Sequence, residues 1–486
     1  MRHHPFWFAC VAALLVPTAV EAQMQPHREA GTTQKERLIV LTDIGGEPDD
    51  SMSITRLLLY SNEIDVEGLV ATTSVWMKNK SHPEAIREIV TAYGKVRQNL
   101  LLHAAGYPAA DKLLSLVTTG QPGYGVGSTG DGKDTPGSEL IVRALSSPDP
   151  RPVWVAAWGG VNTLAQALVQ IRGTKPPEEV KRLVAKLRVY TISDQDDAGP
   201  WIRANFPDVF FIVSPGKYEN ATWTGINTVV KGIDNETISN EWIAKNIQQD
   251  HGPLGAAYPD VGWGLEGDTP TFLGLIPNGL NVPERPDFGG WGGRYELYTP
   301  SVGALGDMVS GGIPINPETR PIWSNAIDSY TPYASADYGR AMKPTRDNFT
   351  DFRVTLWRWR DDFQNDMAAR MDWTVEPYAK ANHPPVVKLA HPDQITVRSG
   401  EAFSLSGAGT TDPDGDSLSY LWFNYAEAGS WKTPIPPSGA ENVFHATFKA
   451  PDVSKQETAH FILKVTDKGS PPLTRYKRVI VNILPK

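Results

Sequence analysis

Residues 37–50 read Arg-Leu-Ile-Val-Leu-Thr-Asp-Ile-Gly-Gly-Glu-Pro-Asp-Asp, an unbroken apolar run that passes directly into an acidic segment. The run Arg37–Leu41 has the composition of a strand that is buried on both faces. Strands of this kind occur in parallel sheets whose two faces are covered by helices. Ligands of such sheets bind at the carboxyl ends of the strands, so the acidic segment lies where chemistry is expected.

Four carboxylates, those of Asp43, Glu47, Asp49 and Asp50, fall within this segment. Their mutual repulsion is tolerated when a hard cation lies between them, because Ca²⁺ and Mg²⁺ take oxygen ligands. A plainer alternative is that Asp49 and Asp50 cap the following helix, whose N-terminus favours anions. Capping does not account for Asp43 and Glu47, so the sequence predicts a metal site here.

Strands and helices are expected to alternate from residue 37 to about residue 218. Apolar, β-branched runs predict strands at Arg37–Leu41, Val66–Thr72, Pro152–Ala157, Leu187–Ile192 and Val209–Val213. Amphipathic stretches predict helices at Ser51–Tyr60, Pro83–Gly94, Ser138–Leu145 and Thr163–Arg172. This order predicts an α/β fold with a mostly parallel sheet and helices on both faces.

The length of 486 residues predicts two or three domains. The formal charge of −9 argues against a nucleic-acid partner, since phosphate binding requires clustered Lys and Arg.

The first 22 residues have a basic start, an apolar stretch and a small-residue end at Ala22, which predicts a signal peptide and a secreted or periplasmic protein. The apolar stretch is shorter than the roughly 20 residues that span a bilayer. Cys10, the only cysteine, lies in this segment, so a processed chain would have no disulfide and no thiolate metal site.

The pattern changes twice in the second half of the chain. Residues 255–345 are rich in Gly, Pro and Trp and predict long loops around a site, and helical character returns at Asp351–Trp373. Asn382–Pro385 then marks a boundary, because paired prolines favour an extended connector. Short alternating strands follow, so we expect one domain at residues 35–380 and an all-β, immunoglobulin-like sandwich at 384–486.

The acidic segment resembles that of the nucleoside hydrolases, whose first strand ends in an Asp-x-Asp-Pro-Gly-x-Asp-Asp motif that holds one calcium ion. Asp43, Asp49 and Asp50 match the last three acids of this motif. Six positions separate Asp43 from Asp49 where the family has four, and Leu41 stands in place of the first acid. These departures point to a divergent branch of the family.

Further segments extend the resemblance over residues 35–345. Val153–Ala165 is similar to the strand, loop and helix in which a loop carbonyl, here that of Asn162, binds calcium. Leu265–Pro270 resembles the late loop whose acid, here Asp268, completes the calcium shell; Gly267 replaces the preceding histidine of many members. Asp194–Asp197 lies in the region whose loop reaches over the sugar. The chain is most similar to an exported subgroup described as cellulose-binding.

The resemblance implies a calcium-dependent hydrolase of N- or O-glycosidic bonds to a furanose-like sugar, acting on carbohydrate fragments. It implies a Ca²⁺ ion on Asp43, Asp50, Asp268 and the Asn162 carbonyl. Asp43 would then be the general base, and Asp49 would bind a ring hydroxyl.

The remaining candidates for substrate contacts follow from residue type and position in the chain. Trp76 and Trp201 are expected in the cleft, since indole rings stack on sugars. Gln195, Asp196, Asp197 and Glu266 are expected near the substrate, and Asp196, Asp197 or Glu266 could protonate the leaving group if burial raised a pKa. A solvated turn is an equal alternative for Asp196 and Asp197.

Two alternatives to hydrolysis stay open at this stage. The first is a carbohydrate-binding protein on a nucleoside-hydrolase scaffold, favoured by the missing histidine. The second is a metal-dependent phosphoesterase, disfavoured by the scarcity of histidine ligands. The Asp412–Asp416 turn of the sandwich resembles that of polycystic-kidney-disease and cadherin-like modules, and it is either a second calcium site or an ordinary tight turn.

Overall fold

The computed structural model describes residues 34–214, 218, 221–262, 264–300, 318–332, 347–440 and 442–486. The predicted signal peptide, residues 1–22, lies outside these ranges. Residues 35–486 form one compact unit, so the domain limits 35–380 and 384–486 remain a prediction. No helix within the described ranges is long and apolar enough to cross a membrane.

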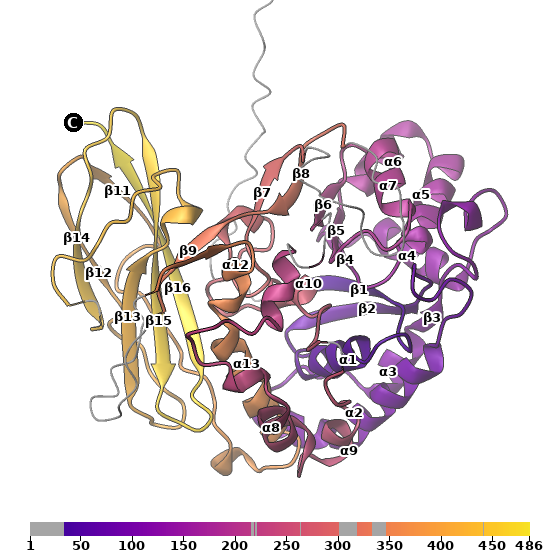
Figure 1. The fold of residues 1–486 in the computed structure, drawn as a ribbon, viewed down its shortest axis with the longest axis horizontal. Helices are drawn as coiled ribbons and strands as arrows, with labels where there is room; N and C mark the ends of the chain where they lie inside the picture. Colours follow the sequence, from indigo (N-terminus) through magenta and orange to yellow (C-terminus); the bar gives the residue numbers. More distant parts are fainter. Residues whose placement is uncertain are drawn as a thin grey trace, which may run out of the picture. The chain divides into compact units, whose positions relative to one another are not determined.

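An eight-stranded sheet forms the centre of the α/β part, in the order β3-β2-β1-β4-β5-β6-β8-β7 (Figure 1). Every neighbouring pair is parallel except β7 and β8. The strands are β1 (Glu36–Thr42), β2 (Ile64–Ala71), β3 (Val117–Thr119), β4 (Val153–Ala157), β5 (Leu187–Thr191), β6 (Phe210–Val213), β7 (Tyr295–Tyr298) and β8 (Ile322–Asn325). The predicted α/β fold with a mostly parallel sheet is therefore confirmed.

Both faces of this sheet are covered by helices (Figure 1). Side chains alternate along β1, so Ile39 and Leu41 pack under α4 to α7, whereas Leu38 and Val40 pack toward α1 and α2. The helices are α1 (Asp49–Leu59), α2 (Pro83–His103), α3 (Ala110–Ser115), α4 (Pro136–Ser146), α5 (Asn162–Thr174), α6 (Pro177–Val184), α7 (Ala198–Asn205), α8 (Asn240–Ile243), α9 (Gly252–Ala256), α10 (Pro270–Leu273), α12 (Val354–Trp357) and α13 (Arg360–Asp372).

The sheet reverses its direction of growth between β1 and β4, since β2 and β3 follow on one side and β5 and β6 on the other. The connections above β1 and β4 therefore diverge and leave a crevice at their carboxyl ends. The acidic segment after β1 and the loop after β4 meet at this point.

The C-terminal strands form sheets of the order β11-β16-β15-β13 and β12-β14, with a core that includes Trp422 and Phe461. Their bounds are β11 (Gln394–Arg398), β12 (Ala402–Ser406), β13 (Leu418–Asn424), β14 (His445–Lys449), β15 (Glu457–Asp467) and β16 (Thr474–Leu484). The arrangement is consistent with the predicted immunoglobulin-like sandwich. Two short strands, β9 (Asp328–Tyr330) and β10 (Phe349–Asp351), pair with each other. The segment 255–345, predicted as loops, therefore contains β9 as well as β7 and β8 of the central sheet.

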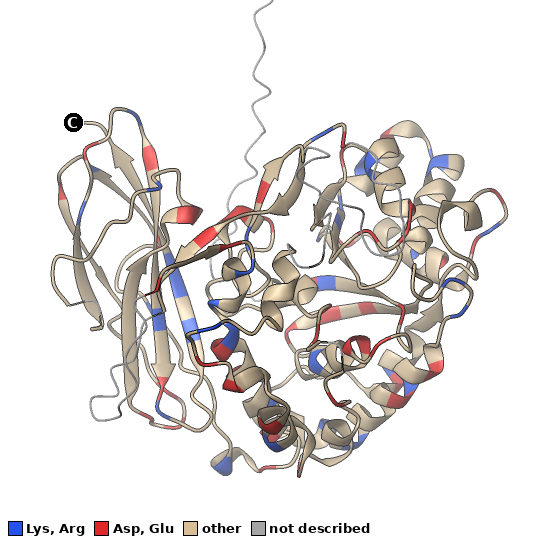
Figure 2. Cartoon of the chain, viewed as in Figure 1, with Lys and Arg blue, Asp and Glu red and all other residues tan. Residues whose placement is uncertain are grey.

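Helix α13 contacts β16 through buried charges, and Figure 2 shows acidic residues on α13 and basic residues on β16. Asp366 accepts hydrogen bonds from Arg475 at 2.6 Å, Tyr60 at 2.7 Å and Arg370 at 3.1 Å. Burial alone would raise the pKa of Asp366, but the charges of Arg475 and Arg370 outweigh it and hold the pKa below its usual value. The ionised carboxylate is thus the stable form in the folded chain.

Replacing Asp366 with alanine is expected to lower the free energy of unfolding by about 3–5 kcal/mol, because two buried guanidinium groups lose their partner. Asp361→Ala, on the exposed side of the same helix, should change it by less than about 1 kcal/mol. Denaturant melts at pH 7 measure both values. Since the folded-state pKa of Asp366 is lowered, its contribution should disappear only as the pH falls below about 4. A difference that persists unchanged at lower pH contradicts this account.

Candidate metal and substrate site

The loop after β1 places Asp43 at the floor of the crevice. Gly45 has a φ of +100°, and a Cβ there would lie 2.8 Å from the His82 ring, so the tight turn requires glycine. A Cβ on Gly159, in the loop after β4, would lie 2.9 Å from the Asp43 carboxylate. The two loops at the direction change of the sheet therefore meet over Asp43.

Ser74, in the loop after β2, holds the Asp43 side chain. The Ser74 hydroxyl oxygen accepts hydrogen bonds from the backbone N–H groups of Trp76 at 3.0 Å and Met77 at 3.1 Å. Its own proton is thereby directed to Asp43, with which it forms a side-chain hydrogen bond. Burial raises the pKa of Asp43 to about 6, although this hydrogen bond opposes the shift.

Asp49, Asp50 and Asp268 bring one carboxylate oxygen each to within 4.8 Å of one another. Asp49 and Asp50 open α1, and Asp268 comes from the loop before α10, more than 200 positions later in the chain. Asp50 also accepts a hydrogen bond from Thr42 of β1. The fold thus joins the acidic segment to the distant acid that sequence analysis paired with it.

These carboxyl groups disfavour one another's ionisation. Burial and the charges of Glu47 and Asp43 raise the pKa of Asp49 to about 7. Burial and the neighbouring aspartates raise the pKa values of Asp50 and Asp268 well above the usual range. At neutral pH the cluster therefore favours either protons or an added positive charge.

The group fits a hard cation by its own chemistry. Oδ2 of Asp268, a residue that is 2% exposed, is buried and has no hydrogen-bond partner. None of the cavity-lining residues that the structure describes is a lysine, arginine or histidine. The donor set consists of carboxylate oxygens, which Ca²⁺ and Mg²⁺ prefer.

A cavity of about 390 Å³ opens over the acids. Its walls are largely aromatic, and Trp76, which is 51% exposed, stands among them with Trp158, Tyr218 and Trp223. Gln195 and Ile192 also contribute to the wall, and the Gln195 amide donates a hydrogen bond of 2.5 Å to the Trp158 carbonyl. The lining thus combines acids with flat apolar rings, as a sugar site requires.

Three predicted residues lie beside the cavity rather than among its lining residues. The Asn162 side chain donates to the Gly123 carbonyl at 2.7 Å, and its backbone N–H donates to Asp196 at 3.0 Å. Burial raises the pKa of Asp196 to about 7, although backbone N–H groups at the starts of α5 and α7 oppose the shift. Asp197 accepts a hydrogen bond from the Val126 N–H at 2.7 Å. These contacts tie two loops to α5.

Glu266 and Trp201 also lie outside this set of lining residues. Glu266 is fully buried and forms an ion pair with Arg56, with 2.5 Å between Oε2 and Nε. The Trp201 ring packs against Phe206 and lies under the Arg172 guanidinium.

Several lining residues have no motif that marks them in the sequence. Trp158, Tyr218 and Trp223 line the cavity and Ser74 holds Asp43; they come from the loops after β4, β6 and β2, and only the folded sheet brings these three loops together. The sequence marks them only by their position after predicted strands. Ser74 and Trp158, for example, lie within a few residues of the ends of β2 and β4.

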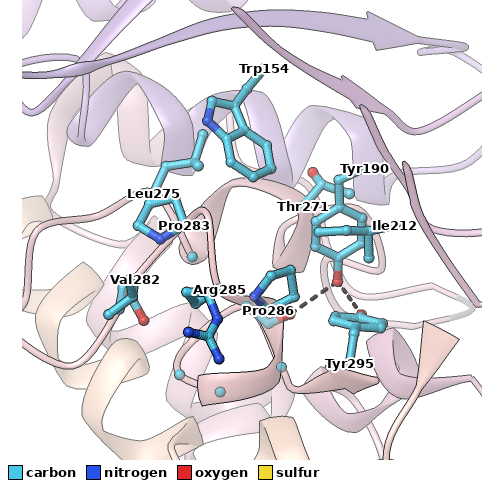
Figure 3. Close-up of a pocket in the computed structure, with 16 residues that line it drawn as sticks. Trp154, Tyr190, Ile212, Thr271, Leu275, Val282, Pro283, Arg285, Pro286 and Tyr295 are labelled. Carbon is cyan, nitrogen blue, oxygen red and sulfur yellow. Dashed lines mark hydrogen bonds between the residues drawn. The ribbon is translucent and has the colours of Figure 1, made fainter. Parts of the chain in front are cut away.

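Figure 3 shows a second cavity, of about 400 Å³, whose lining includes Trp154, Leu275 and Pro283. Its only charged lining residue is Arg285, which is paired with Asp287. Tyr190 in its wall donates to the Gly292 carbonyl at 3.0 Å. None of the acids that the structure describes lines this second cavity, so the first cavity is the candidate site.

The turn of the sandwich also gathers acids, since Asp412, Asp414 and Asp416 bring carboxylate oxygens within 4.8 Å of one another. Asp414 is paired with His383 at 3.0 Å, and Asp412 accepts the backbone N–H groups of Asp414 and Asp416. These contacts are those of an ordinary acidic turn, and both interpretations of the turn stay open.

Comparison with known proteins identifies the family. The family model described as cellulose-binding Sde182, nucleoside hydrolase-like domain, matches residues 37–295. The chain belongs to this family. The model of the C-terminal domain of the cellulose-binding protein Sde0182 matches residues 402–483. The predicted relation to the cellulose-binding subgroup of nucleoside hydrolase-like proteins is confirmed.

A solved structure extends the similarity of this Sde182-family chain to almost its full length. It is a nucleoside hydrolase-related protein from Saccharophagus degradans, described as associated with carbohydrate metabolism. The two are 33% identical with a TM-score of 0.75, over 93% of this chain and 100% of the other. A PKD domain from the KIAA 1837 protein is 20% identical over 21% of this chain and 88% of its own, with a TM-score of 0.15 that supports no further conclusion. No curated protein matches the chain.

The repulsion within the acidic group predicts an inverted pH dependence of stability in protein treated with a chelator. Because the folded-state pKa values are raised, thermal stability should increase as the pH falls from 8 to 5 and the carboxyl groups take up protons. Asp268→Asn should stabilise the chelated protein at pH 8 by about 1–3 kcal/mol, since its amide can donate to the neighbouring carboxylates. Calorimetry across this pH range measures both effects. Equal stability of variant and wild type at pH 8 contradicts the prediction.

Proposed function

We propose that this protein hydrolyses a glycosidic bond to a furanose-like sugar at the acidic cavity, with a calcium ion as cofactor and carbohydrate fragments as substrates. The supporting observation is the close approach of Asp49, Asp50 and Asp268 beneath aromatic walls. A family described as cellulose-binding and a relative associated with carbohydrate metabolism support the substrate class.

Asp50 and Asp268 would hold the ion, with Asp49 as the third carboxylate of the close group and Asp43 beside them. The Asn162 carbonyl is the further ligand that the family resemblance implies. When bound, calcium supplies positive charge that binds sugar hydroxyls and makes a neighbouring water more acidic. Its charge also removes the repulsion that otherwise keeps the carboxyl groups protonated.

Asp43 is suited to act as the general base. Ser74 fixes one side of its carboxylate, and the carboxylate lines the cavity beside the acids that would hold the ion. Asp43 accepts a proton from water while the water oxygen bonds to the anomeric carbon. The bond to the leaving group breaks, and positive charge that develops on the sugar is stabilised by Asp49.

The leaving group departs on the side of Trp76. This ring is half exposed at the cavity, so an aglycone that lies against it remains in contact with solvent. The lining residues described in the structure include no histidine that could protonate the leaving group. This arrangement favours aglycones that are stable as anions, such as aryl groups.

A non-catalytic carbohydrate-binding protein is the second candidate. The observation that favours it is that the lining residues described in the structure include no histidine. The same cation and aromatic walls would then hold a sugar without turning it over.

Activity assays separate the two candidates. Aryl furanosides, nucleosides and cello-oligosaccharides are incubated with wild type and Asp43→Asn, with and without chelator. Hydrolysis should require calcium and should fall at least about 100-fold in Asp43→Asn, as expected for loss of a general base. The exposed Asp208→Asn is the matched control and should retain full activity. Sugar binding without turnover in the wild type would refute catalysis and support the binding protein.

Trp76→Ala tests the aromatic wall independently of catalysis. Loss of ring stacking should raise KM or Kd for the sugar about 3–10-fold, with kcat nearly unchanged, since stacking contributes about 0.5–1.5 kcal/mol. Trp201→Ala, at a tryptophan outside the cavity, is the matched control. Equal effects of the two substitutions would place the substrate elsewhere.

A further inference from the structure

Arg56, in the last turn of α1, is wholly buried. Its Nε lies 2.5 Å from Oε2 of Glu266, a residue that is also wholly buried. The other Glu266 oxygen accepts a hydrogen bond of 2.5 Å from the Tyr258 hydroxyl. Both carboxylate oxygens of Glu266, which lies two positions before Asp268, are therefore held by neighbouring side chains.

Glu266 also has an unusual backbone. Its φ of +48° lies in the left-handed region, which a residue with a side chain seldom occupies unless its surroundings hold it there. The turn that begins at this residue is closed by a hydrogen bond from the Thr269 N–H to the Glu266 carbonyl at 3.2 Å. Asp268 lies inside this turn, so the conformation of Glu266 decides where the Asp268 carboxylate points.

The rest of the Arg56 guanidinium binds α13. One nitrogen donates to the Phe363 carbonyl at 3.0 Å, and another donates to the Gln364 side chain. Gln364 in turn donates to the Thr237 carbonyl at 2.7 Å. The guanidinium is thus fixed from a third element and cannot follow a displacement of the 265–270 loop.

Arg56 joins the two elements that carry the acidic group, beside a hydrogen bond of 2.8 Å from the Thr269 hydroxyl to Ser53 of α1. Asp49 and Asp50 stand at the first turn of α1, and Arg56 is six residues further along the same rigid helix, about 9 Å in axial rise. Asp268 stands on the loop that Arg56 holds. Arg56 is accordingly the direct charged link between the two elements that carry the acids.

We propose that Arg56 is a positioning residue that, through Glu266, sets the place of Asp268 relative to Asp49 and Asp50 and so determines cation affinity. The inference rests on the cation site of the proposed function. Arg56 touches neither the cavity nor a reacting atom, so its effect reaches the site through the loop. A purely structural role would lower stability without changing affinity in the folded protein.

The test removes the pair as a whole. A single substitution leaves an unpaired buried charge, whereas R56M/E266Q leaves none and keeps an acceptor for Tyr258. The matched control is R37M/E67Q, because Arg37 and Glu67 form a similar pair, with 2.6 Å between Nε and Oε1, at the amino end of β1. Calcium affinity is measured by calorimetry on the full chain. It should fall about 10–100-fold in R56M/E266Q and change less than twofold in the control.

Hydrogen exchange of the Thr269 and Thr271 amides supplies a readout that needs no metal. Both amides close the Asp268 turn and should exchange faster in R56M/E266Q and not in the control. Unchanged calcium affinity in folded R56M/E266Q overturns the proposal. If the wild type binds no calcium, the proposed function fails, and unchanged exchange then overturns the positioning role while faster exchange supports it. Should the double variant not fold, Tyr258→Phe, which removes one bond to Glu266, should lower affinity about 3–10-fold, and an unchanged value overturns the proposal.

Discussion

Electrostatic repulsion among buried carboxylates is the constraint on which the rest of the site depends. Asp43, Asp50 and Asp268 are almost wholly buried, and burial together with mutual charge raises the pKa of each. A fold tolerates such a group only where other contacts hold the acids in place. Here the contacts are the Thr42 and Ser74 hydroxyls, the start of α1 and the clamped loop that carries Asp268. The group therefore favours binding of a cation, because the positive charge of the ion offsets the repulsion between the carboxylates.

The sheet determines which acids can meet. The direction change between β1 and β4 opens a crevice at their carboxyl ends, and the loops after β1, β2 and β4 all reach it. Small residues keep this crevice narrow, since a side chain at Gly159 would collide with Asp43. The position of the site therefore follows from topology, whereas its chemistry follows from a few side chains on the loops.

The α/β fold could be predicted because buried strands and amphipathic helices leave periodic patterns. Five strands and three of the four helices lie near their predicted bounds, whereas α2 runs nine residues past the predicted end at Gly94, to His103. Asp43, Asp49, Asp50 and Asp268 could be predicted to meet because strand ends and a family motif mark them. The surroundings of Glu266 could not be predicted, because its partner Arg56 stands 210 positions earlier and appears in the sequence as an ordinary helix residue. The role of α13 could not be predicted either, because its charged residues lie on all sides of the helix and are explained only by contacts with β15 and β16.

The buried charges around α13 connect the sandwich to the site in a physical sense. Asp362 and Asp366 of α13 bind Lys464 and Arg475 of the sandwich, while Gln364 of the same helix binds Arg56. Removing one partner of a buried pair is costly, so these pairs with the sandwich help to fix the position of the helix. Because Arg56 takes its own position from α13, the sandwich contributes to the geometry of the acids without lining their cavity. The sandwich can therefore affect the acidic cavity of the α/β part although none of its described residues lines that cavity.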